Sequence, residues 1–350
     1  MKKRIAVGLS GGVDSSVAAY LLKKKGWDVV GFTLKFYPEE NRCCDLDSLE
    51  KTRQLCHRLD IPHYILDVGE LFKKEIIDYF VDSYLQGLTP NPCVYCNQLI
   101  KFGIFLEKVQ SLGIDYLATG HYARLVKKDK TYLIKAGKDS SKSQEYFLAL
   151  VNRKILKYLV FPLGNYNKSK VKRIAKDKKV IHIDRGESQD VCFVKEKSYP
   201  EFIEKSCSDY CKYSGQIKHV NGENLGRHKG IYQYTYGQRS GLGLAWKEPL
   251  YVIGINSKDN SIVVGERKYL KRDSFTVNSL NWFCSVEQYK NITVKVRYNS
   301  SVFACSLKIK GSNAEVELEK EIDAITPGQL AGFYYKDLLL GGGIIDKFKV

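Results

Sequence analysis

The sequence predicts an α/β protein: a parallel sheet with helices on both faces, a small central module, and a C-terminal β-barrel-like domain. Up to about residue 200, short apolar runs alternate with longer stretches of helical periodicity. After Tyr199 the runs become short, alternate in polarity and are separated by turn residues. A glycine-rich stretch, Gly226 to Gly243, lies between the two textures. We therefore expect domains at 1–200, 201–265 and 266–350.

The first domain is expected to be a β-α-β alternation. Apolar runs rich in Val, Ile and aromatic residues indicate strands, and apolar residues on one face of a 3.6-residue period indicate helices. The strands are expected at Arg4–Leu9, Asp28–Phe36, Tyr64–Val68 and Tyr116–Gly120, and the helices at Ser15–Lys25, Asp47–Leu59 and Leu71–Leu85. Such a sheet is parallel and binds ligands at the carboxyl ends of its strands.

The remaining modules are expected to be antiparallel. Short alternating segments broken by Gly, Asn, Asp or Ser are typical of small sheets and barrels. They are Leu250–Ile255, Ser261–Val264, Ile292–Tyr298 and Val302–Ile309.

Composition indicates a globular protein with a polyanionic partner. Hydrophobic residues make up 44% and charged residues 27%, and the formal net charge is +17, which favours nucleic acid over membrane as the partner. The stretch Arg153–Lys179 holds ten basic residues and one Asp; it is either a landing site for a nucleic-acid backbone or a solvated helix face.

Targeting and disulfide signals are weak. Ten cysteines in 350 residues are too few for a secreted disulfide scaffold. The apolar run Ile5–Leu9 is too short for a signal peptide. No stretch approaches the roughly 18 apolar residues of a membrane span. We therefore expect a soluble cytoplasmic protein without a membrane partner.

The strongest local signal is the loop Ser10-Gly11-Gly12-Val13-Asp14-Ser15-Ser16, between an expected strand and an expected helix. Glycines let backbone N–H groups approach a polyphosphate, and the helix N-terminus adds partial positive charge. Asp14 beside phosphate suggests a bridging Mg²⁺. The loop lacks the G-K-[ST] of a Walker motif. The alternative is an ordinary strand-to-helix turn with a serine cap.

Two cysteines that are far apart in the sequence are candidate reactive thiols. Cys96 follows Asn91-Pro92-Cys93 at the start of a helix, and Cys192 ends Ser188-Gln189-Asp190-Val191. A thiol at a helix N-terminus near Lys101 is partly thiolate. Two such thiols beside a phosphate-binding loop suggest sulfur transfer, one carrying a persulfide and the other resolving it. The seven cysteines other than Cys93, Cys96 and Cys192 are expected to be structural, although Cys207 and Cys211 are spaced like a metal pair.

Several motifs occur in order along nearly the whole chain. They are S-G-G-V-D-S-S (10–16), A-T-G-H-Y-A-R (118–124), F-P-L-G (161–164), E-S-Q-D-V-C-F (187–193), Y-T-Y-G-Q-R-S-G-L-G (234–243), P-G-Q (327–329) and L-G-G-G-I-I (340–345). The first resembles the loop of the PP-loop ATP pyrophosphatases, and the whole set resembles the tRNA-specific 2-thiouridylases. The resemblance implies a sulfurtransferase that uses ATP and Mg²⁺ to convert the wobble uridine of tRNA to 2-thiouridine.

The resemblance also implies roles for individual residues. Cys96 is the catalytic nucleophile and Cys192 the persulfide carrier. The implied ATP contacts are Gly8, Leu9, Ser10, Gly11, Gly12, Val13, Asp14, Ser15, Leu34 and Gly120. The implied tRNA contacts are His121, Lys142, Ser143, Gln144, Arg297, Tyr298 and Gln329, with Asn91, Pro92 and Cys93 facing the target base. A cysteine desulfurase or sulfur-relay protein is the implied sulfur donor.

One position departs from the family pattern. Cys93 stands where the family loop has aspartate, so an acid/base role there is in doubt. Cys93, Cys96 and Cys192 offer three thiolates, one fewer than an ordinary iron–sulfur cluster takes. A [4Fe–4S] cluster on these residues, its open iron holding sulfide, is therefore a further hypothesis.

The expected chemistry has two steps. The uridine oxygen attacks the α-phosphate of ATP and releases pyrophosphate; sulfur then attacks carbon 2 and AMP leaves. Two alternatives remain open at this point. One is another adenylating or amidating ligase with the same loop, which needs no cysteine pair. The other is a non-catalytic RNA-binding protein.

Overall fold

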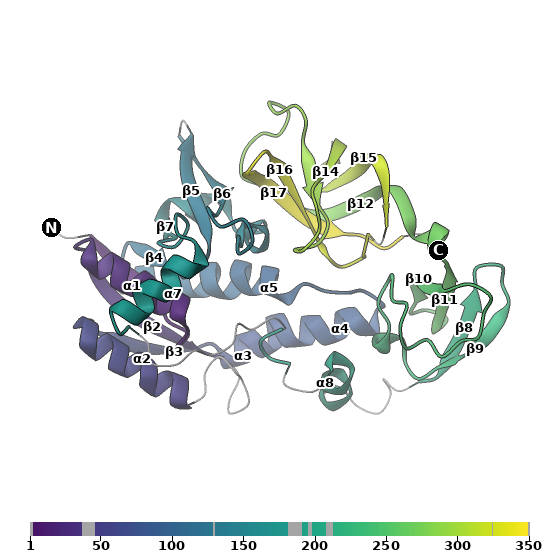
Figure 1. Cartoon of the computed structure of the whole chain (residues 1–350), viewed down its shortest axis with the longest axis horizontal. Coiled ribbons are helices and arrows are strands. Elements are labelled where there is room, and N and C mark those ends of the chain that lie inside the picture. Colours follow the sequence, from purple (N-terminus) through teal and green to yellow (C-terminus); the bar gives the residue numbers. More distant parts are fainter. Residues whose placement is uncertain are drawn as a thin grey trace.

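Three bodies make up the protein, an α/β domain, a small β module and a β-barrel (Figure 1). The computed structural model describes residues 3–36, 46–128, 130–180, 191–194, 198–207, 213–323 and 325–348 of the chain. The expected fold class, a helix-covered parallel sheet followed by a central module and a C-terminal barrel, is confirmed.

The first sheet is parallel and has five strands in the order β3-β2-β1-β4-β7. Their bounds are β1 Arg4–Gly8, β2 Asp28–Lys35, β3 His63–Asp67, β4 Tyr116–Ala118 and β7 Leu159–Val160. Strand residues alternate between two apolar cores: Ile5 and Val7 pack with Leu22 and Leu55, whereas Ala6 packs in the cluster of Phe32 and Phe105 on the other face. Both faces of the sheet are therefore buried, as a parallel sheet requires.

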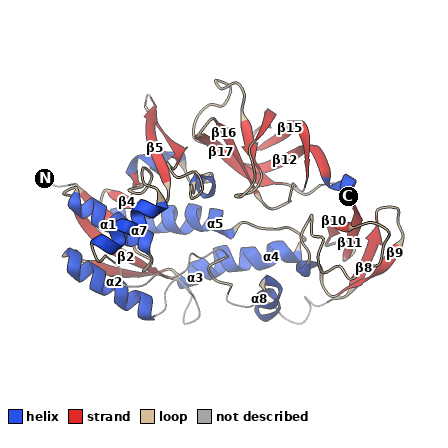
Figure 2. Cartoon of the chain, viewed as in Figure 1, coloured by secondary structure: helices blue, strands red, loops and turns tan. Residues whose placement is uncertain are grey.

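Helices cover both faces of this sheet (Figure 2). Helices α1 (Val13–Lys24) and α2 (Leu46–Leu59) contribute to one core, and α7 (Lys168–Asp177) packs on α1. On the other side run two long helical segments, each containing a π-helix. They are α3 Gly69–Phe72, η1 Lys73–Asp78 and α4 Tyr79–Leu85, and then α5 Pro92–Tyr95, η2 Cys96–Ile104 and α6 Phe105–Ser111. The sequence predicted neither π-helix.

The central module is a four-stranded sheet in the order β10-β11-β8-β9. It is mixed and not purely antiparallel as expected, because β8 and β11 pair in parallel. Its strands are β8 Gly215–His219, β9 Asn224–His228, β10 Leu250–Asn256 and β11 Ser261–Glu266. Helix α8 (Tyr199–Ser206) precedes it. Short 3-10 helices lie in the first domain at Glu145–Leu148 and Arg153–Tyr158, and further along the chain at Ile231–Gln233 and Arg267–Leu270.

The C-terminal body is an antiparallel barrel. Its strands follow the order β12-β15-β14-β13-β16-β17, and pairing of β12 with β17 closes it. They are β12 Lys271–Trp282, β13 Thr293–Lys295, β14 Phe303–Lys310, β15 Asn313–Asp323, β16 Leu330–Tyr335 and β17 Leu338–Ile345. The strand expected at Ile292–Tyr298 is shorter than predicted, because the chain turns at Arg297 and Ser300.

The barrel is joined to the first domain by a shared sheet. The hairpin β5 (Ala123–Lys128) and β6 (Thr131–Ala136) was not expected, and β17 pairs with it at Leu338–Lys135 and Leu339–Ile134. Backbone hydrogen bonds between β17 and β6 therefore fix the barrel against the α/β domain. In the view of Figure 1 the barrel lies above α4 and α5.

Candidate active site

The glycine loop joins the end of β1 to the start of α1. Gly11 has φ +72, a conformation that favours glycine, and a Cβ there would lie 3.1 Å from Ser48 Cβ. The Ser10 amide donates to Ser15 Oγ at 3.2 Å, and the hydroxyls of Ser15 and Ser16 donate to the Gly12 carbonyl. The loop thus curls over the N-terminus of α1, where hydroxyls and partial positive charge suit phosphate.

A lysine that the sequence did not single out neutralises this loop. Lys168 Nζ lies 2.7 and 2.8 Å from the two carboxylate oxygens of Asp14, and the Tyr122 hydroxyl donates to the same carboxylate at 2.8 Å. The Lys168 side chain is only 14% exposed. Lys168 belongs to the basic stretch that was expected to be either a landing site for a nucleic-acid backbone or a solvated helix face, but its side chain points into the loop. Its place at the first position of α7, after F-P-L-G, was the available signal.

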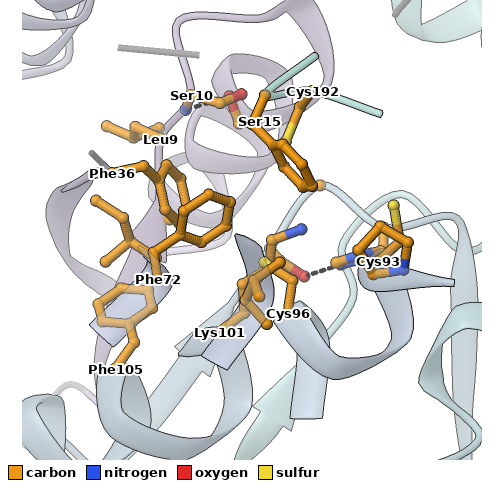
Figure 3. Close-up of a pocket in the computed structure, with 18 of the residues that line it drawn as sticks. Leu9, Ser10, Ser15, Phe36, Phe72, Cys93, Cys96, Lys101, Phe105 and Cys192 are labelled. Atoms are coloured by element: carbon orange, nitrogen blue, oxygen red, sulfur yellow. Dashed lines mark hydrogen bonds between the residues drawn. The ribbon is translucent and has the colours of Figure 1, made fainter. Parts of the chain in front are cut away.

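One cavity of about 410 Å³ adjoins the loop and the cysteines. Cys93, Cys96 and Cys192 lie around it with Ser10 and Ser15 (Figure 3). Its other lining residues are Gly8, Leu9, Asp14, Leu34, Phe36, Phe72, Ile76, Pro92, Lys101, Phe105, Thr119, Gly120, His121, Gln144, Val191 and Phe193. The structure therefore brings seven of the expected ATP contacts, namely Gly8, Leu9, Ser10, Asp14, Ser15, Leu34 and Gly120, to the same cavity as both expected catalytic thiols. Gly11, Gly12 and Val13 belong to the loop but do not line this cavity.

The three cavity thiols differ in exposure. Cys93, in the short helix α5, is exposed, whereas Cys96, at the start of η2, is buried and Cys192 is half-buried. Ser188, Gln189 and Asp190 lie outside the described residues.

The π-helix η2 explains why Lys101 shares this cavity with Cys96. In a π-helix the backbone bonds run five residues back, as from the Phe105 amide to the Ile100 carbonyl. Residues five apart then fall near one face, whereas in an α-helix they point well apart. Both Cys96 and Lys101 line the cavity (Figure 3).

The other cysteines that the structure describes do not line this cavity. Burial raises the pKa of the Cys56 thiol to about 11 and that of Cys305 to about 12, and Cys284 packs against the main core. Cys207 is disulfide-bonded, so it is not a metal ligand here. Cys43, Cys44 and Cys211 lie outside the described residues.

The described ranges contain no group of three or more His, Cys, Asp or Glu side chains that could hold a metal ion. Cys93, Cys96 and Cys192 border one cavity without being gathered into a ligand set. This arrangement does not match a preformed iron–sulfur site.

His121 lies in the wall of the cavity and is neutral. Its Nδ1 is 2.7 Å from Thr119 Oγ1, and its ring packs between Phe102 and Phe161. Burial, and then the charge of Lys101, lowers the pKa of His121 to about 3. A neutral imidazole can donate one hydrogen bond and accept one, but it carries no positive charge to pair with a phosphate.

The residues expected to touch tRNA fall into two groups. The first group lines the cavity and consists of Pro92, Cys93, His121 and Gln144. Asn91 directly precedes Pro92 in the chain. Gln144 Oε1 accepts from the Tyr122 amide at 3.0 Å, Ser143 is buried and hydrogen-bonded to Gly137, and Lys142 is half-buried beside them.

The second group lies on the barrel. Arg297 donates to Thr326 Oγ1, and the Tyr298 ring packs 4.5 Å from that of Phe147. Gln329 donates to the carbonyls of Thr89 and Pro90. These three side chains therefore lie at the contact between the barrel and the first domain.

The described part of the chain has no helix that is both long and apolar enough to cross a membrane.

Models of known protein families match nearly the whole chain. Three family models match consecutive segments: a tRNA methyl transferase HUP domain at 3–196, a tRNA methyl transferase PRC-barrel domain at 201–266 and an aminomethyltransferase beta-barrel domain at 272–345.

Curated relatives match from end to end. The chain is 42% identical to tRNA-specific 2-thiouridylase MnmA 2 of Thermoanaerobacter sp. (strain X514), over 99% of both chains. It is 42% identical to tRNA-specific 2-thiouridylase MnmA of Aquifex aeolicus, over 98% of this chain and 99% of the relative. For the Clostridium acetobutylicum protein of that name the identity is 39%, over 99% and 100%. The chain belongs to the tRNA-specific 2-thiouridylase family, the sulfurtransferases that its loop and cysteine motifs resemble.

Proposed function

We propose that this protein uses ATP to 2-thiolate the wobble uridine of tRNA, by adenylating the C2 carbonyl oxygen and then transferring sulfur from a cysteine persulfide. The observation that carries the proposal is the cavity lined by Ser10, Asp14 and Ser15 of the glycine loop together with Cys96 and Cys192. An activating site and a sulfur-delivering site that share one cavity can act on one carbon without releasing the adenylate. An amidating ligase has no use for the two thiols.

In the first step, uridine O2 attacks the α-phosphate of ATP and pyrophosphate leaves. The amides of Gly11 and Gly12 and the hydroxyls of Ser10 and Ser15 stabilise the charge that builds on the phosphates. Asp14 is the carboxylate suited to hold Mg²⁺, which supplies further charge neutralisation when bound. Lys168 is positioned to balance the charge of Asp14.

In the second step, the terminal sulfur of the Cys192 persulfide attacks C2, and AMP departs with the former O2. The Cys96 thiolate attacks Cys192 Sγ, which breaks the persulfide S–S bond, leaves sulfur on the uridine and forms a Cys96–Cys192 disulfide. A cellular thiol reduces this disulfide before the next cycle. The persulfide is reloaded by a cysteine desulfurase or a sulfur-relay protein.

The tRNA is expected to bind across the cavity mouth, and the formal charge of +17 supports a nucleic-acid ligand. The uridine must leave the anticodon stack to reach C2 chemistry inside the cavity. The residues implied for this contact are those of 91–93, His121, 142–144, Arg297, Tyr298 and Gln329. A cytoplasmic location accords with this substrate and stays a prediction.

Replacing Cys192 by serine tests the proposal. With ATP, tRNA and a persulfide source, the variant should still release pyrophosphate in a tRNA-dependent manner but form no 2-thiouridine by nucleoside mass spectrometry. Cys284→Ser, outside the cavity, is the matched control and should keep both activities. Full 2-thiouridine formation by Cys192→Ser would refute the role of Cys192 as the persulfide carrier. An ATP-dependent amidation that both the wild type and Cys192→Ser carry out, without 2-thiouridine, would favour an amidating ligase. Absence of tRNA-stimulated pyrophosphate release from the unmodified protein would favour a non-catalytic RNA binder.

The [4Fe–4S] hypothesis has its own test. Iron and acid-labile sulfide are measured after anaerobic purification, together with the thiolation rate. A cluster on Cys93, Cys96 and Cys192 requires about four irons per active chain. A colourless, iron-free and fully active preparation would eliminate it and leave the persulfide mechanism.

A further inference from the structure

The turn Thr326-Pro327-Gly328-Gln329 of the barrel is held rigidly by its own domain. It lies between β15 and β16, and Thr326, Pro327 and Gly328 are buried. The Gly328 amide donates to the Ile345 carbonyl at 2.8 Å, and the Ile345 amide donates to the Gln329 carbonyl at 2.8 Å. Gly328 has φ +88, which favours glycine. The position of Gln329 is therefore set by the closed barrel.

This turn is docked on the linker between α4 and α5. The Thr89 amide donates to the Pro327 carbonyl at 2.9 Å, and Gln329 Nε2 donates to the carbonyls of Thr89 at 2.9 Å and Pro90 at 3.2 Å. A Cβ on Gly328 would lie 3.0 Å from both the nitrogen and the oxygen of Thr89. The contact is thus a close backbone approach reinforced by one side-chain amide.

The linker has few means of holding itself. Pro90 and Pro92 have no N–H group to donate. At its start, Gly87 has φ +75 and lies against Ile255 of the central module, where a Cβ would be 2.6 Å from the Ile255 side chain. The amides of Gly87 and Leu88 still bond back to α4, so the later modules fix the path mainly of the part from Thr89 onward. In Figure 1 the barrel lies over the linker.

The linker leads directly into the catalytic segment. Helix α5 begins at Pro92, and Cys93 and Cys96 follow in the cavity wall. Arg297 supports the same arrangement, because it donates to Thr326 of the docked turn.

We infer that Gln329 is a positioning residue, which acts from the barrel through the linker carbonyls to hold Cys93 and Cys96 against the ATP loop. This inference deepens the proposed function and rests on it for its catalytic consequence, whereas its structural part concerns the chain alone. It assigns Gln329 a role besides the tRNA contact implied by the family resemblance.

The test replaces Gln329 by methionine, which keeps the length of the side chain and removes both donated hydrogen bonds. Alkylation of each cysteine by N-ethylmaleimide is followed by peptide mass spectrometry on the full chain without tRNA or ATP. We expect alkylation of the buried Cys96 to become about tenfold faster, because the linker opens more often. The exposed Cys93 should react at an unchanged rate and serves as the internal reference. Gln288→Met is the matched control, since Gln288 is an exposed barrel residue that bonds only locally to Ser285.

Kinetics separate positioning from tRNA contact. In Gln329→Met the kcat for 2-thiouridine formation should fall about tenfold, with the Kd for tRNA changing less than about twofold. A weakened tRNA affinity with unchanged Cys96 alkylation would overturn the inference and leave a tRNA contact. Wild-type alkylation together with wild-type kcat would also overturn it.

Two safeguards keep the outcome decisive. Should Gln329→Met not fold, as judged by thermal unfolding, Gln329→Asn gives the same comparison, because its amide is one methylene too short to reach both carbonyls. Should the wild-type protein form no 2-thiouridine, the proposed function fails, while the alkylation experiment still decides whether Gln329 holds the linker.

Discussion

Replacing Lys168 by methionine gives the sharpest test of how the ATP loop is built. The change removes an ammonium group that lies 2.7 Å from Asp14 Oδ2 and 2.8 Å from Oδ1. The aliphatic part of the side chain remains, so the packing of α7 on α1 is largely preserved. What changes is the charge balance of the loop.

The expected loss of unfolding free energy depends on how deeply the ion pair between Lys168 and Asp14 is buried. Removing one partner of a fully buried ion pair costs about 3–5 kcal/mol, whereas an exposed pair contributes less than about 1 kcal/mol. The Lys168 side chain is 14% exposed and that of Asp14 is 33% exposed, and Tyr122 still donates to the carboxylate. We therefore expect the free energy of unfolding to fall by about 2 kcal/mol.

ATP binding should suffer as well. Without Lys168, the full negative charge of Asp14 faces the incoming phosphates, and the KM for ATP should rise about tenfold, equivalent to about 1.4 kcal/mol.

Denaturant unfolding and tRNA-dependent pyrophosphate release measure the two effects. Lys108→Met, an exposed lysine on α6, is the control, and a cycle with Asp14→Asn isolates the pair in the stability measurement. If Lys168→Met costs no more stability than Lys108→Met and leaves the KM for ATP unchanged, the pair does not organise the loop.

Three further predictions concern single positions. Gly120→Ala would place a Cβ 2.9 Å from the Ser15 backbone nitrogen, so kcat/KM for pyrophosphate release should fall between about tenfold and a hundredfold; an unchanged value would mean that the loop yields freely. Gly164→Ala would place a Cβ 2.0 Å from the Ala123 carbonyl oxygen and should lower the free energy of unfolding by about 2–3 kcal/mol, measured in urea. Because the pKa of His121 is lowered from 6.5 to about 3, the unfolded chain binds the extra proton between these values, and stability should fall by up to about 1.4 kcal/mol for each unit that the pH drops below 6.5. His121→Gln should flatten that part of the curve of unfolding free energy against pH, and an identical slope would show that other groups dominate.

The fold class could be predicted from the sequence because the signals that indicate it are local. Strand and helix periods, turn residues and the glycine loop are all readable within ten residues, and they placed β1, β2 and the loop within one or two residues of their bounds. The hairpin β5–β6 was missed since its apolar alternation is weak, and its pairing with β17 joins residues two hundred positions apart. The π-helices were missed because apolar spacing does not distinguish a π turn from an α turn over so few residues.

The sequence motifs alone predicted the loop, Cys96 and Cys192 as site candidates. The order of the motifs along the chain indicated the family. Only the tertiary structure decided that Ser10, Asp14 and Ser15 of the loop share a cavity with these cysteines, that Lys168 faces Asp14 instead of solvent, and that Gln329 binds the linker before Cys93 and Cys96. The physical reason is that a side chain's chemistry is written in its residue type, whereas its partner depends on which distant segment the packed sheets and barrel bring within hydrogen-bonding reach.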